Sequence, residues 1–238
     1  DSTAPAEHRA VLLQTANGLP QIDITRPNTN GVSINRFSQF DITAHGAVIN
    51  NGRAASATAL AGWVAANPAL LGGEAKLIIN DVRSNHPSLL QGYIEIAGSK
   101  ADFILANPAG ITCAGCGFLN AQRIELATGT PHWQASTPGA PAASGTAPGH
   151  VPGTIPGGPP GYVLGPGHFQ VHGAGLDGCR TSAASILTQA AQINAALWAQ
   201  HLQLRLAAAE RTAAGTPTPP PPPPTFALDV AAIGGMYA

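Results

Sequence analysis

The sequence predicts an all-β protein, a right-handed parallel β-helix with β-hairpin excursions and one long Pro/Gly-rich loop. Short runs rich in Ile, Leu and Phe alternate with turn residues, and the segment 92–129 has no helical-length apolar periodicity. The composition of 28 Gly, 22 Pro and one Met is typical of a turn-rich β-protein. An Asn-Pro-Ala sequence occurs at Asn67 and again at Asn107. This repeat predicts two turns of a solenoid with a period of about 20 residues.

Strands are predicted in chain order wherever a short apolar or alternating run lies between turn residues. After a polar lead over residues 1–16, they are expected at 21–24, 32–37, 40–43, 47–50, 76–81, 93–97, 103–106, 118–127 and 169–171. The Ala-rich stretch 53–66 predicts a helical turn or an excursion from the solenoid, anchored by Trp63. A β-rich chain of 238 residues is commonly one domain, so residues 1–238 are expected to form a single domain.

Low charge excludes two classes of partner. Charged residues make up 10% of the chain, the net charge is -1, and the basic residues are scattered singly. We therefore expect no binding of nucleic acid or of an anionic membrane surface. No apolar run reaches the length of a membrane span, which predicts a soluble chain. The chain starts at Asp1 without a basic or apolar leader, so we expect that any signal peptide has been removed.

Two tetrapeptides predict sharp corners after strands. They consist of Asn67, Pro68, Ala69 and Leu70, and of Asn107, Pro108, Ala109 and Gly110. Proline lacks the N–H that a sheet ladder needs, and glycine adopts backbone angles that other residues avoid. Asn also recurs near other strand ends, at Asn35, Asn50, Asn51, Asn80 and Asn120. These are interpreted as turn residues whose amides bond to the backbone of neighbouring turns.

The same motifs carry a family resemblance. NPAL, NPAG, the block GYIEIAGSKADFILANPAG and the earlier NTNGVSINRFSQFDITAHGAVINN resemble the N-terminal two-partner secretion (TPS) domain of exoproteins of the filamentous haemagglutinin, haemolysin and contact-dependent inhibition type. The resemblance covers 19–130, 169–206 and 226–238. The family pattern is NPNL and NPNG, and Ala replaces the second Asn at both places here. Asn-Pro is kept, so the corner geometry is expected to remain.

The resemblance implies a function and a route. Such a domain passes through the periplasm of a Gram-negative bacterium and is captured by the periplasmic domains of a dedicated outer-membrane β-barrel transporter. It then nucleates β-helix folding at the cell surface, as a monomer, for a secreted adhesin or toxin that can meet host or neighbouring cells. The two Asn-Pro motifs are expected to serve transporter recognition, folding or both. The alternative function is a carbohydrate- or receptor-binding adhesin module with the same fold.

Three interpretations compete for Cys113 and Cys116, which form CAGC. A zinc site needs four ligands, and there is no second CxxC or His pair. A thioredoxin-like motif opens a helix after a strand, whereas CAGC lies between a Pro-Gly corner and an apolar strand. A structural disulfide suits an exported protein, as in family members that carry this CxxC. Cys179 is then left outside the framework.

The second half contains segments of different character. Residues 131–167 hold 9 Pro, 9 Gly and no Asp, Glu, Lys or Arg, which predicts a mobile loop. Apolar residues within 182–201 recur at helical spacing, whereas those within 202–206 alternate as in a strand. Because the corresponding family segment is stranded, strands are expected over 182–206. Residues 216–225 predict a polyproline connector, and 226–230 rejoin the solenoid.

The sequence predicts neither an enzyme nor a cofactor site. Gly173, Gly175 and Gly178 match GxGxxG, but the acidic residue about 20 positions on and further βα units are missing, so they are interpreted as turn residues. His132 and His150 have no metal-ligand spacing. Acids are dispersed along the chain without pairs, which excludes the clustered carboxylates of polysaccharide-cleaving solenoids. No catalytic residue, metal or cofactor is therefore assigned.

Overall fold

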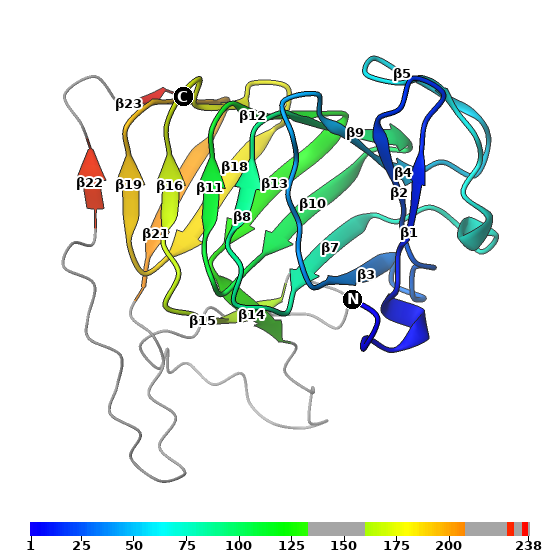
Figure 1. Ribbon diagram of the computed structural model, residues 1–238, viewed down its shortest axis with the longest axis horizontal. Helices are drawn as coiled ribbons and strands as arrows, with labels where there is room; N and C mark the ends of the chain where they lie inside the picture. Colours follow the sequence, from blue (N-terminus) through cyan, green and yellow to red (C-terminus); the bar gives the residue numbers. More distant parts are fainter. Residues whose placement is uncertain (133–159, 208–227, 231–234, 238) are drawn as a thin grey trace, which may run out of the picture.

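Three sheets run side by side along the length of the molecule. The computed structural model describes residues 1–132, 160–207, 228–230 and 235–237, and its colours follow the chain along the long axis (Figure 1). The eight-stranded sheet contains β1 (Val11–Gln14), β2 (Pro20–Asp23), β4 (Ala47–Asn51), β9 (Tyr93–Gly98), β12 (Cys116–Leu119), β17 (Leu176–Gly178), β20 (Ala196–Ala199) and β23 (Gly235–Tyr237). The six-stranded sheet contains β21 (Leu202–Leu206), β18 (Ala183–Thr188), β13 (Ala121–Ala127), β10 (Ala101–Ala106), β7 (Leu77–Val82) and β3 (Val32–Phe37). The five-stranded sheet contains β22 (Leu228–Val230), β19 (Ala191–Ile193), β16 (Phe169–Val171), β11 (Ile111–Cys113) and β8 (Ser88–Leu90).

Each turn of the chain adds one strand to each sheet in the same order. The strands β9, β10 and β11 form one turn, and β12 and β13 pair with β9 and β10 in the next. Ile94 pairs with Phe118 and Phe103 with Ile124, so a turn without an excursion takes about 21 to 24 residues. All these pairings are parallel except that of β1 with β2. The predicted parallel β-helix is confirmed.

The core fills the space between the three sheets. Phe103 and Phe118 pack there with ring centroids 5.4 Å apart, and Phe169 is fully buried in the same cluster. Burying one such side chain contributes about 1.5–3 kcal/mol. Ile104 and Ala106 point to the opposite face of β10 and belong to a second buried cluster. This explains the run of apolar residues on both faces of that strand.

Two hairpins provide the cover for outer sheet faces. β14 (Gly129–His132) pairs antiparallel with β15 (Gly161–Leu164), and Tyr162 is 1% exposed in the cluster that covers the six-stranded sheet. The prediction of a mobile loop over 131–167 was therefore wrong for 131–132 and 161–164, which are in strands. The buried side chains of Tyr162 and Leu164 pack these strands against the six-stranded sheet. Its centre, 133–159, and the connector predicted at 216–225 lie outside the described residues.

The second hairpin confirms an excursion from the solenoid at 53–66, one of the two alternatives expected there. β5 (Ser56–Thr58) and β6 (Gly62–Val64) form an antiparallel excursion against the eight-stranded sheet, in place of a helical turn. Its loop is held by the Glu95 carboxylate, which accepts the amides of Ala59 and Leu60 at 2.7 and 2.8 Å. Trp63 does not anchor it, because its side chain is 74% exposed while Val64 is 2% exposed.

The N-terminal end of the β-helix is covered. The expected polar lead contains the 3-10 helix η1 (Ala6–His8) and strand β1, which closes the eight-stranded sheet in antiparallel orientation. Strand β1 was not predicted, because Val11, Leu12 and Leu13 do not alternate with polar residues. All three are substantially exposed on an edge strand.

The remaining strands follow the predictions with a few corrections. The expected strand 40–43 is reduced to one bridge between Ile42 and Leu90, and the run 118–127 is divided at Asn120, which has a φ of 56°. The predicted strands across 182–206 are confirmed by β18, β19, β20 and β21. β22 confirms the return to the solenoid for 228–230. The described part of the chain contains no helix with the length and apolarity to cross a membrane.

Candidate functional site: two Asn-Pro corners and the CAGC turn

The first Asn-Pro motif forms a capped corner between β4 and β7. Pro68, Ala69 and Leu70 form the 3-10 helix η2, and Asn67 is its N-cap. The Asn67 Oδ1 accepts the Ala69 amide at 2.9 Å. Proline suits the first helical position because its missing N–H would have no helical partner there. Local chemistry alone thus accounts for the turn.

The Asn67 amide also ties this corner to the preceding turn, through Ile24 after β2, and to its own strand β4, through Asn50. Its Nδ2 donates to the carbonyl oxygens of Ile24 at 3.0 Å and Asn50 at 3.1 Å. Asn67 is 3% exposed, and Leu70 enters the main core at 1% exposure. Pro68 faces solvent and Ala69 is half-buried. The asparagine is therefore structural in its contacts, while the next two residues form the accessible part of the corner.

The second motif repeats this arrangement between β10 and β11. The Asn107 Oδ1 accepts the Ala109 amide at 2.9 Å, and its Nδ2 donates to the His86 carbonyl oxygen at 2.9 Å and to Ser88 Oγ at 3.0 Å. Asn107 has no exposed surface. Gly110 ends the corner with a φ of 118°, a conformation that side chains other than hydrogen rarely permit.

The following turn rests directly on the second corner. A Cβ at Gly165 would lie 2.3 Å from the Pro108 carbonyl oxygen, and one at Gly167 would lie 2.1 Å from the Gly110 nitrogen. The Gly167 amide donates to the Pro108 carbonyl at 2.9 Å. The Asn107 corner is thus enclosed by turns on both sides, whereas Pro68 stays accessible.

The two motifs are not equivalent positions of a repeat, contrary to the interpretation of two full turns between them. Asn67 stands where the chain passes from the eight-stranded to the six-stranded sheet, and Asn107 where it passes from the six-stranded to the five-stranded sheet. Because the two corners occupy different places within a turn, their spacing in sequence is not a whole number of turns and does not measure the period.

Other asparagines use their amides in the same way. Asn51 Nδ2 donates to the carbonyls of Ala75 and Ser99, each at 2.9 Å, and Asn120 Nδ2 bonds Ile96 at 2.7 Å. Asn35 and Asn50 also bond to backbone groups through both ends of the amide. Asn80 differs because its buried Oδ1 has no hydrogen-bond partner among the described residues.

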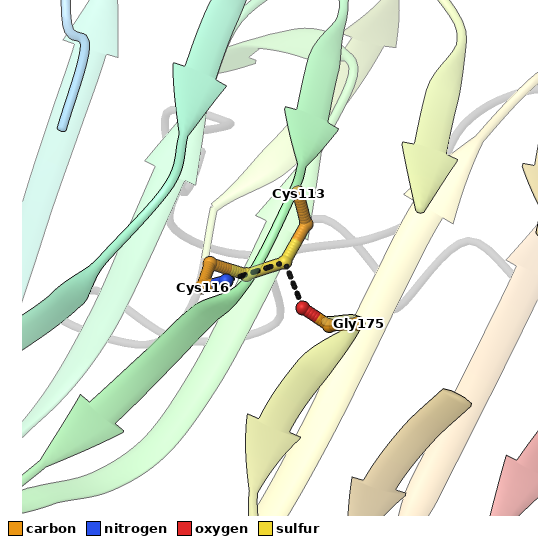
Figure 2. The surroundings of a disulfide bond; sticks show 3 residues. All are labelled: Cys113, Cys116 and Gly175. Carbon is orange, nitrogen blue, oxygen red and sulfur yellow. Dashed lines mark hydrogen bonds between the residues drawn. A yellow bond between two sulfur atoms is a disulfide. The ribbon is translucent and has the colours of Figure 1, made fainter. Parts of the chain in front are cut away.

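The CAGC turn connects the five-stranded to the eight-stranded sheet. Figure 2 shows the disulfide between Cys113 and Cys116, whose Cα atoms are 5.3 Å apart. The Cys116 amide lies 3.3 Å from Cys113 Sγ, which is itself 3.2 Å from the Gly175 carbonyl oxygen (Figure 2). A disulfide sulfur carries no hydrogen, so the latter is a close contact. Both cysteines are buried, and Cys179 is free and exposed.

Ionisable groups beside the CAGC turn form a structural pair. Tyr93 lies across Gly117 and its hydroxyl donates to Asp177 at 2.7 Å. This bond raises the pKa of Tyr93. Burial favours the neutral form of Asp177, but the bonds from Tyr93 and from the Cys179 amide outweigh it and lower the Asp177 pKa. Within the described ranges, no group of three or more His, Cys, Asp or Glu could hold a metal ion.

Comparison with known proteins matches the whole chain to one family. A family model described as "TPS secretion domain" matches residues 1–238. Toxin CdiA of Yersinia pestis is 38% identical over 243 residues, covering 100% of this chain and 7% of that protein. Hemolysin of Serratia marcescens is 47% identical over 116 residues, covering 49% of this chain and 7% of that protein. The chain thus spans about 7% of the length of these curated relatives.

A solved structure extends the match to three dimensions. The crystal structure of filamentous hemagglutinin secretion domain superposes with a TM-score of 0.74 at 26% sequence identity. The match covers 97% of this chain and 74% of that chain.

Proposed function

This chain belongs to the TPS secretion domain family, and we propose that it directs the export of a much longer adhesin or toxin. In this proposal the domain is recognised by a dedicated outer-membrane β-barrel transporter through the periplasmic domains of that transporter. The folded domain then serves as the start of a β-helix at the surface of a Gram-negative cell. The similarity to a toxin and to a hemolysin supports an exported cytotoxic protein.

The difference between the two ends of the β-helix carries the folding part of this proposal. At one end, β1 and η1 cover the first turn. At the other end, β21, β22 and β23 are the outermost strands of the three sheets among the described residues. Unpaired strand edges accept further strands, and repeat folds grow by adding units to the last one. Additional turns of the exported protein therefore have a surface on which to stack.

Folding outside the cell gives export a direction. A domain of this kind gains about 5–15 kcal/mol on folding, which disfavours return through a narrow pore. The domain need not perform a reaction for this, and we assign it no catalytic residue. The nuclease named in several relatives refers to proteins of which this chain covers 6–7%.

The Asn-Pro corners are proposed to contribute in two separable ways. Both asparagine amides are buried and occupied by backbone bonds, which supports a role in folding. Pro68 and Ala69 remain accessible in the folded domain, which makes them the part of the motif available to the transporter. A change at Pro68 should therefore affect recognition more than stability, and a change at Asn107 the reverse.

Transporter-dependent secretion tests the function. The domain, preceded by a signal peptide, is expressed with and without its cognate transporter, and the medium and periplasm are assayed for folded protein. We expect β-rich protein in the medium only with the transporter. In the same assay, Asn30→Ala is the matched control for Asn107→Ala, because Asn30 is exposed and its side chain makes no hydrogen bond among the described residues. Folded protein retained in the periplasm despite the transporter would refute the assignment and favour a free-standing adhesin module.

A further inference from the structure

The two lysines of the chain both line one shallow groove. It lies at the corner between the eight-stranded and six-stranded sheets and is lined by Lys76, Lys100, Ala101, Asp102, Gln122 and Arg123. The three cations come from successive turns, about 24 residues apart in sequence, which is the length of one turn. Basic residues that are scattered singly along the chain are thus stacked in space.

The sheet geometry aims these side chains into one place. The Asp102 amide donates to the Lys76 carbonyl at 2.9 Å, which fixes the turn that carries Lys76 against the turn that carries Lys100. Between β10 and β13 the register shifts opposite Asp102, at the position of Gln122 and Arg123. Such bulges redirect a side chain, and here Arg123 Nε lies 3.1 and 3.2 Å from the two oxygens of Asp102.

The groove keeps a positive charge after this pairing. Asp102 neutralises Arg123, while Lys76 and Lys100 are exposed and form no ion pair with any described residue. The stem of Lys76 is ordered by Gly31, where an added Cβ would lie 3.1 Å from Lys76 Cγ. Two uncompensated ammonium groups therefore stand on neighbouring turns, whose strands are about 4.8 Å apart.

We propose that this groove binds the sulfate or phosphate groups of an acidic glycan. Ammonium groups on successive turns match oxyanions that recur along a chain, and the groove crosses the turns rather than following one strand. The lining contains no aromatic residue on which a nucleobase could stack. Two free lysines are also fewer than the four to eight basic residues that anionic membranes usually require. A sulfated or phosphorylated glycan is consistent with a lining that has no aromatic residue and only two free lysines.

Binding to immobilised dextran sulfate tests the proposal, with neutral dextran of equal size as the reference. We expect saturable binding to dextran sulfate alone, weakened as sodium chloride is raised. Lys76→Gln/Lys100→Gln should reduce the affinity at least about tenfold. The matched control Arg53→Gln/Arg205→Gln removes two exposed cations outside the groove and should change it less than about twofold. Equal losses in both double variants would show a general charge effect and overturn the site.

Asp102→Asn provides a variant with the opposite expected sign. It frees Arg123 and should raise the affinity for dextran sulfate about threefold, whereas an unchanged or lower affinity in the folded variant contradicts the proposal. Inorganic phosphate should shift the amide resonances of Lys76 and Lys100 at higher concentration than the glycan. If free phosphate binds as tightly as the glycan, or a single-stranded oligonucleotide binds more tightly, the glycan assignment is wrong.

Discussion

Replacing Asn107 with alanine should destabilise the domain strongly. The substitution removes an amide with no exposed surface and all three of its hydrogen bonds, to Ala109, His86 and Ser88. The backbone bonds of residue 107 remain, because its amide still donates to the Ala127 carbonyl. The loss therefore measures the side chain alone.

The magnitude follows from what each lost bond leaves behind. A protein hydrogen bond contributes about 1 kcal/mol net, so three account for about 3 kcal/mol. The Ala109 amide is half-buried and can reach water, whereas the Ser88 hydroxyl is buried and adds about 1–2 kcal/mol if it stays unpaired. We expect a total of about 3–5 kcal/mol, a large part of the about 5–15 kcal/mol typical of a domain.

Urea denaturation followed by far-ultraviolet circular dichroism measures this loss. The midpoint should fall while the slope stays constant, since the surface exposed on unfolding is nearly unchanged. Asn30→Ala should remain within about 0.5 kcal/mol of the parent protein. A loss below about 1 kcal/mol for Asn107→Ala, with normal export, would falsify the inference that this amide joins two turns of the β-helix.

Three further changes test other parts of the structure. Replacing Cys113 and Cys116 with alanine should lower the free energy of unfolding by about 2 kcal/mol, the value for so short a loop, and reductant should then have no further effect on the urea midpoint. Tyr162→Ala should cost about 3–5 kcal/mol and increase proteolysis at 129–132, because the buried ring holds β14–β15 on the sheet. Burial raises the pKa of the Glu125 carboxyl above its ordinary value. The protonated carboxyl therefore contributes to the stability of the folded state below the ordinary pKa, and this contribution is lost as the pH rises through the raised pKa. Glu125→Gln should therefore be at least as stable as the parent at pH 7 and lose its advantage at pH 4, by urea midpoints; a lower midpoint at pH 7 contradicts this.

Strands with clear periodicity could be predicted, and those defined by their neighbours could not. Residues 32–37 and 169–171 were placed correctly because apolar side chains recur between turn residues. β8 and β11 have three residues each and acquire strand geometry only by pairing with adjacent turns. The helical spacing within 182–201 was overridden because Ile186 and Leu197 both pack into the core between the sheets.

The corners show the same division between local and non-local information. The Asn-Pro sequence predicts a turn because the cap of Asn67 is closed by Ala69, two residues away. Its bonds to Ile24 and Asn50 could not be predicted, since they depend on how the chain stacks the preceding turn and strand β4 beside this corner. The lysine groove was missed for a related reason: its spacing gains meaning only once the length of a turn is known.

Because the base of the β14–β15 hairpin is closed by paired strands, the length of the chain between β14 and β15 does not affect the register of the β-helix. Gly129 pairs with Leu164, and the Gly165 amide donates to the Thr128 carbonyl at 2.9 Å, so the chain returns to the point from which it left. Doubling the length of chain between the two strands would add only about 0.6 kcal/mol of closure entropy. Evolution can therefore lengthen or exchange this segment, and a protein engineer can place a foreign peptide in it, without shifting the register of any turn.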